Sequence, residues 1–155
     1  HGGAVEIAST PGQGTTFTLR LPLTLAILRV LTARVGTERY LLPLSYVAET
    51  VEFDVQPRTD VKGREAIVLR DRVIPIVHLR SLLGVDGGEV PPRRPGLALE
   101  VGDRRSAVVV DSLVGQQEVV VEPFDAPKGT APLFSGATIL ADGTPALILD
   151  AAALV

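Results

Sequence analysis

The chain has 155 residues, of which 46% are hydrophobic and only 4% aromatic, so aliphatic side chains must fill a packed core. Its net charge of −3 gives no electrostatic basis for nucleic-acid binding, and the absence of cysteine excludes disulfides and thiolate metal sites. The longest apolar run, residues 21–31, contains Arg29 and falls short of the roughly 20 residues of a membrane-spanning helix, so we expect no membrane insertion.

The first predicted element is a β-hairpin. Residues 4–9 (AVEIAS) alternate in polarity, PGQG forms a turn, and residues 15–21 (TTFTLRL) alternate again, so one face is apolar. An isolated hairpin is marginally stable, and we expect this one to be frayed or to support self-association through its open edge. Its glycine-rich turn resembles a phosphate-binding loop, but no Gly-Lys-Ser/Thr follows it.

Beyond residue 25 the sequence predicts an all-β fold. Short apolar runs recur between turns rich in Gly and Asp, which is typical of a barrel or sandwich. Residues 79–84 (LRSLLG), with Gly84 as the C-terminal cap, and the final DAAALV have helical character, and we expect residues 84–96 to form a loop. The predicted strands are residues 27–35, 39–44, 49–53, 66–70, 73–79, 96–101, 106–111, 117–124, 137–141 and 145–150.

An internal repeat divides this region into two similar β units of about 60–70 residues each. The aligned blocks are 31–47 with 97–113, at an offset of 66, and 67–83 with 138–154, at an offset of 71. The second alignment matches Ile76 with Leu147. Because the offset grows by five residues, the second unit must carry an insertion between its two blocks.

Few side chains are candidates for catalysis. His78 has no second histidine or acidic pair at metal-ligand spacing, so we expect a structural or surface role and no metal site. No Gly-x-Ser-x-Gly elbow is present, and the sequence therefore predicts a binding module, not an enzyme. Four aspartates lie at strand ends or in turns, where we expect turn geometry to explain them: Asp71, Asp111, Asp142 and Asp150. Four glutamates alternate with apolar residues and are expected on solvated strand faces: Glu49, Glu52, Glu118 and Glu122.

Apolar residues beyond the needs of the core are candidates for partner contact, and they are densest in residues 28–33, 40–47 and 119–121. Each of them could instead belong to the core. The residues that we predict to contact partners are Leu31, Leu42, Leu44, Val47, Val119, Val121 and Ile139.

Five segments together resemble the C-terminal part of chemotaxis histidine kinases of the CheA type. They are GGAVEIASTPGQGTTFTLRLPLTLAIL, VGTERYLLPLSYVAETV, GREAIVLRDRVIPIVHLRSLLG, VVVDSLVGQQEVVVEPF and FSGATILADGTPALILD, in the family's order. The resemblance implies that residues 1–24 are the last hairpin of the kinase's ATP-binding domain and a linker. Gly14 and Thr15 match that domain's Gly-Thr motif as a remnant, which alone binds no cofactor, whereas ATP and Mg²⁺ belong to the intact parent.

Residues 25–155 resemble the CheW-like regulatory domain of these kinases, which in the family is two SH3-like β barrels. The implied partners are a CheW-type coupling protein and the cytoplasmic tips of chemoreceptors, at membrane-associated receptor arrays in the cytoplasm. The implied role is to couple receptor state to kinase autophosphorylation. The family's phosphorylated histidine lies in a separate domain, so neither His1 nor His78 inherits that role.

Two other interpretations compete with this one. A stand-alone CheW-like coupling adaptor would have no use for the ATPase-type hairpin at residues 1–22. An intact ATP-binding enzyme would need nucleotide-binding elements that the sequence lacks. Because the sequence contains no methionine, we expect it to be a piece of a longer protein.

Overall fold

The computed structural model describes residues 4–10, 14–20, 26–54, 59–61, 64–85, 91–125 and 132–155. Side chains are described for residues 26–53, 65–85, 91–125 and 132–155. These residues are built mostly from β-strands, which confirms the predicted all-β class. None of the helices in the described ranges is long and apolar enough to cross a membrane.

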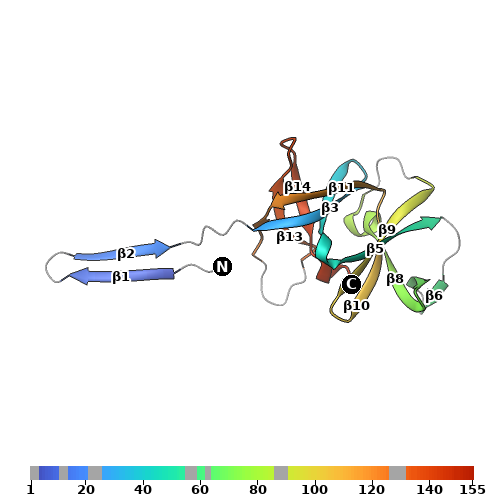
Figure 1. The fold of residues 1–155 in the computed structure, drawn as a ribbon, viewed down its shortest axis with the longest axis horizontal. Coiled ribbons are helices and arrows are strands. Elements are labelled where there is room, and N and C mark those ends of the chain that lie inside the picture. The colour runs from blue at the N-terminus through green and yellow to red at the C-terminus, as the bar shows by residue number, and fades with distance from the viewer. Residues whose placement is uncertain are drawn as a thin grey trace.

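The predicted N-terminal hairpin is present as a two-stranded sheet of its own (Figure 1). β1 (Ala4–Thr10) pairs antiparallel with β2 (Gly14–Arg20), which confirms the predicted hairpin, while its apolar face stays a prediction. The predicted nucleotide-site remnants Gly14 and Thr15 begin β2, and their side chains lie outside the described part of the structure. The domain boundary predicted after residue 24 also lies outside the described residues and stays a prediction.

The remaining strands form two six-stranded sheets, each curled into a small barrel (Figure 1). Barrel 1 has the order β5 (Val47–Asp54), β9 (Arg93–Val101), β10 (Arg104–Val109), β8 (Arg72–His78), β7 (Arg64–Leu69) and β6 (Thr59–Val61). Barrel 2 has the order β11 (Ser112–Val120), β3 (Ile27–Val35), β4 (Glu38–Pro43), β14 (Pro145–Leu149), β13 (Phe134–Ile139) and β12 (Glu122–Pro123). Short helices follow β4, β8 and β14, namely η1 (Leu44–Tyr46), α1 (Leu79–Leu83) and η2 (Ala151–Ala153).

The two sheets repeat each other strand for strand, which confirms the predicted duplication. β9 and β10 are β3 and β4 displaced by 66 residues, and each pair holds the same place in its sheet. The two units do not form one barrel each, however. The β3–β4 hairpin of the first unit completes barrel 2 through the parallel pair β4–β14, and the β9–β10 hairpin of the second completes barrel 1 through β8–β10. Each barrel therefore contains strands from both units.

The predicted offset of 71 is wrong by one residue in β8 and β14. Ile76 pairs with Ala107 and Ile148 pairs with Leu41, and these two partners are themselves 66 residues apart. Ile76 therefore corresponds to Ile148, not to Leu147, and the offset in this strand is 72. Both isoleucines pack with the interior of their barrels. Because strand side chains alternate between faces, a slip of one residue would have exchanged the inner and outer faces.

Within the described ranges, three apolar clusters hold the fold together. Two fill the barrel interiors, and the third lies between the barrels, where it takes side chains from both. Along β3, Val30 enters the interior of barrel 2 and Leu31 enters the central cluster; along β4, Leu41 and Leu42 divide in the same way. These strands are buried on both faces, which explains why they read as continuous apolar runs.

The predicted loop at residues 84–96 is too long. Gly84 caps α1 as predicted, with a φ of 68° that favours glycine, but β9 already begins at Arg93. Gly96 is therefore a strand residue, and its role is close approach. A Cβ at this position would lie 1.9 Å from the ring of Phe53, so the packing of β9 against β5 requires glycine here.

Candidate partner-binding surfaces

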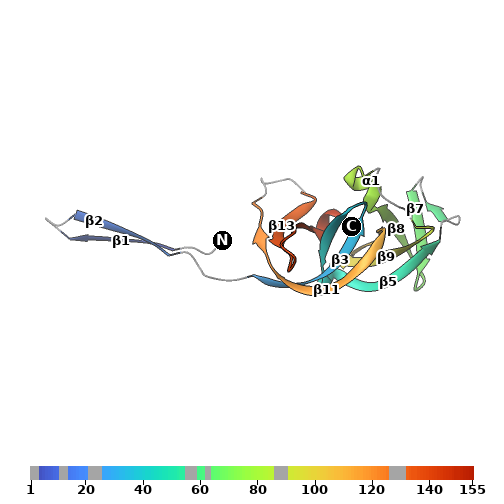
Figure 2. The same ribbon diagram turned by 90° about the horizontal axis from the view of Figure 1, so that it is seen from above.

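Each barrel carries one exposed apolar cross-strand pair on its outer hairpin. In barrel 1, Val68 on β7 lies opposite Val73 on β8, and the two are 61% and 56% exposed. In barrel 2, Ile139 on β13, which is 66% exposed, lies opposite the exposed Pro145 on β14. Val68 and Ile139 are 71 residues apart and hold equivalent places in the repeat. Figure 2 shows β7 and β13 at opposite ends of the two-barrel body, so the duplication has placed one such pair on a hairpin at each end.

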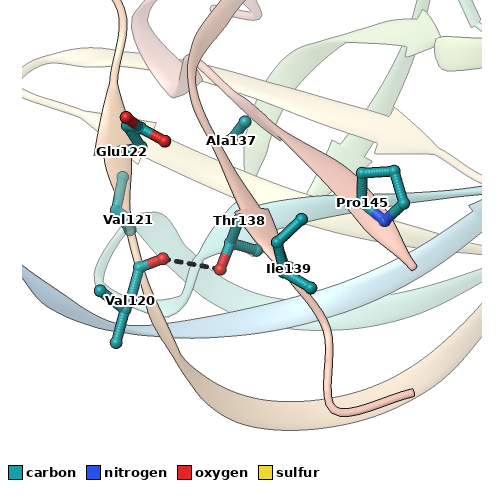
Figure 3. Close-up of a pocket in the computed structure, with 7 residues that line it drawn as sticks. All are labelled: Val120, Val121, Glu122, Ala137, Thr138, Ile139 and Pro145. Atoms are coloured by element: carbon teal, nitrogen blue, oxygen red, sulfur yellow. Dashed lines mark hydrogen bonds between the residues drawn. The ribbon is translucent and has the colours of Figure 1, made fainter. Parts of the chain in front are cut away.

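The pair in barrel 2 borders a hollow of about 450 Å³ between the β11–β12 corner and the β13–β14 hairpin (Figure 3). Val120, Val121 and Ile139 make its wall apolar, and Glu122 lines its edge. The Thr138 hydroxyl donates to the carbonyl oxygen of Val120 at 2.6 Å, which fastens β13 to β11 and closes the barrel beneath the hollow. An apolar hollow with a polar edge is the usual form of a protein-contact site.

The apolar surface of barrel 2 extends beyond this hollow. Ile27, which is 62% exposed, lies directly opposite Val120, which is 52% exposed. We call Ile27, Val120, Val121, Ile139 and Pro145 the barrel 2 surface. The barrel 1 surface consists of Val68 and Val73.

Ion pairs flank both surfaces. Beside the barrel 1 surface, Arg70 Nε donates to Glu49 Oε2 at 2.6 Å, and this bond raises the pKa of Arg70. Beside the barrel 2 surface, Arg39 donates to Asp142 Oδ2 at 2.6 Å and the Thr144 N–H donates to Asp142 Oδ1 at 2.9 Å. These donors hold the pKa of the Asp142 carboxyl well below its usual range. Each apolar surface therefore has charged groups at its side.

A second hollow lies where the chain crosses from barrel 2 to barrel 1. The crossing is made by η1, which contacts β3 of barrel 2 and β9 of barrel 1. Leu28, Arg29, Leu44 and Ser45 line a hollow of about 340 Å³ there, which we call the crossing hollow. The hollow therefore lies beside the crossing, with β3 of barrel 2 on one side and η1 on the other.

Residues 29–155 match the family of the CheW-like domain. The chain belongs to the CheW-like domain family. It is 36% identical over 155 residues to the chemotaxis protein CheA of Bacillus subtilis and 40% identical over 157 residues to that of Salmonella typhimurium. Each alignment covers 99% of this chain but only 23% of the relative, so the chain spans about a quarter of the length of these curated relatives. A third relative, the sensor histidine kinase CheAY of Helicobacter pylori, is 37% identical over 158 residues, which are 99% of this chain and 19% of that protein.

Among solved structures, the chain is similar to the scaffolding protein TtCheW from Thermoanaerobacter tengcongensis. The TM-score is 0.65 at 18% identity, and the match covers 79% of this chain and 88% of that chain. At this identity the likeness concerns the fold alone. It confirms that the two curled sheets of this CheW-like domain are the predicted pair of SH3-like barrels.

Three of the seven predicted contact residues are core residues of the CheW-like domain. Leu31, Leu42 and Val119 are 5%, 0% and 6% exposed, so they have almost no area to offer a partner. The prediction is wrong for these three, because a high local density of apolar residues marks burial on both faces of a strand.

The other four predicted residues reach the surface to different extents. Leu44 and Val47 are half-buried and pack against the central cluster, and Leu44 also lines the crossing hollow. Val121 is half-buried and Ile139 is exposed, and both belong to the barrel 2 surface. For these four, contact with a partner stays a prediction.

Most of the exposed apolar side chains were missed by sequence reasoning. The repeat offered one usable signal, because Ile139 was a predicted contact and the offset of 71 leads from it to Val68. Val120 lies in the apolar segment 119–121 but was not among the predicted contact residues. No comparable signal identified Val73 or Ile27, since an isolated valine or isoleucine in a strand reads the same whether it faces the core or the solvent.

The acidic residues mostly have the predicted turn and surface roles. Asp71 has a φ of 62° in the β7–β8 turn, Asp142 accepts a turn N–H, and Asp150 accepts an N–H as the cap of η2. Glutamates 52, 118 and 122 are exposed and Glu49 is half-buried. Asp111 is the exception and corrects the prediction, because its side chain is 1% exposed and pairs with Arg80 at 3.1 Å.

The described residues hold no cluster of three or more His, Cys, Asp and Glu side chains that could bind a metal ion. His78 is partly exposed and its Nε2 lies 2.7 Å from Glu65 Oε2. The pair sits at the edge of a hollow of about 610 Å³ next to α1 and the C-terminal residues. This arrangement fits the structural or surface role expected for His78.

Proposed function

We propose that the chain is the regulatory region of a CheA-type chemotaxis histidine kinase. In this role it binds a CheW-type coupling protein and chemoreceptor tips, and it couples receptor state to kinase autophosphorylation. The observation that carries the proposal is the pair of equivalent apolar surfaces at the two ends of the body, Val68 with Val73 and Ile139 with Pro145. The CheA relatives support it, because their similarity runs along 99% of the chain and so includes the N-terminal hairpin.

Two apolar surfaces at opposite ends of the body suit a scaffold. A partner that is itself a two-barrel domain can dock on either end, and each contact leaves the other end available. Apolar centres with charged rims are the normal composition of such interfaces, in which a few buried side chains supply most of the affinity. The coupling protein is assigned to these two surfaces.

The receptor contact is assigned to the crossing hollow. Receptor binding can transmit a signal only if the receptor has different affinities for two arrangements of the kinase. The crossing hollow is lined by Leu44 and Ser45, which connect the barrels, and by Leu28 and Arg29 of β3. A partner bound at this place would touch η1, the segment that joins the two barrels, and neither outer hairpin includes that segment.

In this proposal the chain itself is not an enzyme. Phosphoryl transfer, with its ATP and Mg²⁺, belongs to other domains of the parent kinase. The β1–β2 hairpin, including Gly14 and Thr15, would be the end of that ATP-binding domain. The protein would work in the cytoplasm, at membrane-associated receptor arrays.

Calorimetric titration of the chain with its cognate CheW-type coupling protein tests the proposal. Val68→Glu and Ile139→Glu place a charge in the centre of each surface, and each should weaken binding at its own surface by on the order of tenfold or more. Val114→Glu is the matched control, because Val114 is 56% exposed on β11 but lies outside both surfaces. Loss of binding in the control, or full binding by the folded double variant, would refute the assignment of the surfaces. No binding by the unmodified chain would refute the function.

A stand-alone coupling adaptor is the second candidate, because the likeness to the scaffolding protein TtCheW covers 88% of that chain. The two candidates differ in the length of the native protein and in its chemistry. Mass spectrometry of the native protein, followed by incubation with labelled ATP, distinguishes them. A chain several times longer than 155 residues that autophosphorylates supports the kinase, and a short inert chain supports the adaptor.

A further inference from the structure

The backbone passes between the barrels at two equivalent places. The first crossing is η1, between β4 of barrel 2 and β5 of barrel 1. The second is the pair Val110–Asp111, between β10 of barrel 1 and β11 of barrel 2. Ser45 in η1 and Asp111 are 66 residues apart, so the two crossings are counterparts in the repeat.

At the second crossing, consecutive backbone groups bind opposite barrels. The Val110 N–H donates to the carbonyl oxygen of Pro95 in β9 of barrel 1 at 3.0 Å. The next N–H, that of Asp111, donates to the carbonyl oxygen of Arg34 in β3 of barrel 2, also at 3.0 Å. The crossing is thus fixed to both barrels by its main chain.

The Asp111 carboxylate repeats this arrangement with its side chain. Its Oδ2 accepts the N–H of Gly36, in the β3–β4 turn of barrel 2, at 2.7 Å. Its Oδ1 accepts from Nε of Arg80, on the helix α1 that follows β8 of barrel 1, at 3.1 Å. Arg80 NH1 also donates to the carbonyl oxygen of Val85 at 3.2 Å, which holds the guanidinium in place. The buried Asp111 carboxylate is therefore hydrogen-bonded to one element of each barrel.

Arg34 completes the cluster from the barrel 2 side. Its NH1 donates to the carbonyl oxygen of Gly36 at 2.6 Å and lies 3.8 Å from Asp111 Oδ2, and its Nε donates to Ser112 Oγ at 3.1 Å. Charged hydrogen bonds of this kind are strong and directional. The apolar cluster between the barrels supplies no directional bonds of this kind.

Among the residues that the structure describes, the first crossing has no such cluster. The counterpart of Asp111 is Ser45, the counterpart of Arg80 is Ala152, and both are exposed, while the counterpart of Arg34 is Glu100. The Val110 N–H donates a hydrogen bond to the Pro95 carbonyl oxygen, whereas their counterparts Leu44 and Arg29 line the crossing hollow.

We infer that the Asp111 cluster is a pivot for the two barrels. Rotation of one barrel against the other is restricted at the Val110–Asp111 crossing and is taken up at the η1 crossing, where it moves η1 relative to β3, the two elements that line the crossing hollow. The link to receptor control rests on the proposed function, because there the receptor contact is assigned to this hollow. The pivot itself requires no partner and is tested without one.

Distance distributions between spin labels in the chain test the pivot. One pair of labels, at the exposed Thr37 and Ser81, reports on the barrels beside the Asp111 cluster, and the other pair, at Arg29 and Ala48, reports on the η1 crossing. In the otherwise unmodified chain we expect the Arg29–Ala48 distance distribution to be about twofold broader than the Thr37–Ser81 distribution. Equal widths would overturn the inference.

Arg80→Met removes the guanidinium and keeps an unbranched apolar side chain, so α1 can stay packed. It should broaden the Thr37–Ser81 distribution to the width at the η1 crossing. Arg39→Met is the matched control, because it removes an exposed ion pair within barrel 2, and it should change neither distribution. An unchanged Thr37–Ser81 width in a folded Arg80→Met variant would also overturn the pivot.

Amide hydrogen exchange on the unmodified chain supplies a second measurement that needs no variant to fold. The amides of Gly36 and Asp111 should be protected on the order of tenfold more than those of Tyr46 and Val47. Comparable protection at the two crossings would contradict the pivot. Because neither measurement uses the coupling protein, a failed binding titration would leave the pivot standing, and a failed pivot would leave the partner surfaces standing.

Discussion

Replacing Gly96 with alanine should destabilise the domain through one contact. The added Cβ would lie 1.9 Å from Cε2 and 2.5 Å from Cδ2 of Phe53. An ordinary carbon–carbon contact is about 3.5–4.0 Å, so the ring or the strand must move by roughly 1.5–2 Å. Phe53 is 6% exposed in the barrel 1 interior, and β9 is hydrogen-bonded between β5 and β10, so neither can retreat easily. Overpacking of this kind costs about 1–3 kcal/mol, and we expect the upper half of that range.

Urea denaturation followed by circular dichroism gives the free energy of unfolding for this test. Gly96→Ala should lower the midpoint and leave the slope unchanged. Phe53→Leu removes the ring atoms that clash and supplies the matched partner for a double-mutant cycle. The double variant should be more stable than the sum of the single effects by about 1 kcal/mol or more. A Gly96→Ala variant as stable as the original chain, or strictly additive effects, would refute the close-approach reasoning.

Three further predictions concern the surface, the helix and the core. Arg39→Gln should raise the pKa of Asp142 toward the ordinary value of about 3.9 in a carboxyl NMR titration; the pair stabilises the fold above that pH and its contribution is lost as the pH falls through the lowered pKa. Gly84→Ala should cost about 1 kcal/mol in urea unfolding, because φ at this cap is 68°. Leu42→Ala should cost about 2–5 kcal/mol, whereas Ile139→Ala should cost less than about 0.5 kcal/mol, in line with their exposures of 0% and 66%.

The local elements could be predicted because their signals lie in neighbouring residues. Alternation revealed the N-terminal hairpin, and apolar runs between Gly- and Asp-rich turns revealed most strands. The cap at Gly84 followed from the glycine after a short amphipathic segment. The strand β9 was predicted from Gly96, and its first three residues, Arg93 to Pro95, were missed because two arginines and a proline do not read as a strand and their pairing with β5 is a tertiary effect.

The non-local features could not be predicted in the same way. The repeat was visible, but sequence similarity aligned Ile76 with Leu147. Only the pairing of Ile148 with Leu41 shows that the turn between β13 and β14 is one residue longer than the turn between β7 and β8. Asp111 follows a strand as Asp150 does, and nothing in the neighbouring residues shows that Arg80 reaches it. Leu31 and Leu42 were wrongly predicted to contact a partner. The hairpin of each unit completes the barrel of the other unit, and this exchange of hairpins buries both faces of their strands.

The exchange of hairpins also means that neither barrel can form from one unit. In barrel 1, the β9–β10 hairpin lies between β5 and β8, and in barrel 2, β3–β4 lies between β11 and β14. Separate segments of residues 26–85 and 91–155 should therefore each lack a cooperative unfolding transition. Mixed in equal amounts, they should recover the strand spectrum and one shared transition, because each supplies the central hairpin that the other lacks. A segment that folds alone would show that the strands within one unit can close a barrel by themselves. If neither segment folds alone, the two partner surfaces belong to one body that folds and unfolds cooperatively.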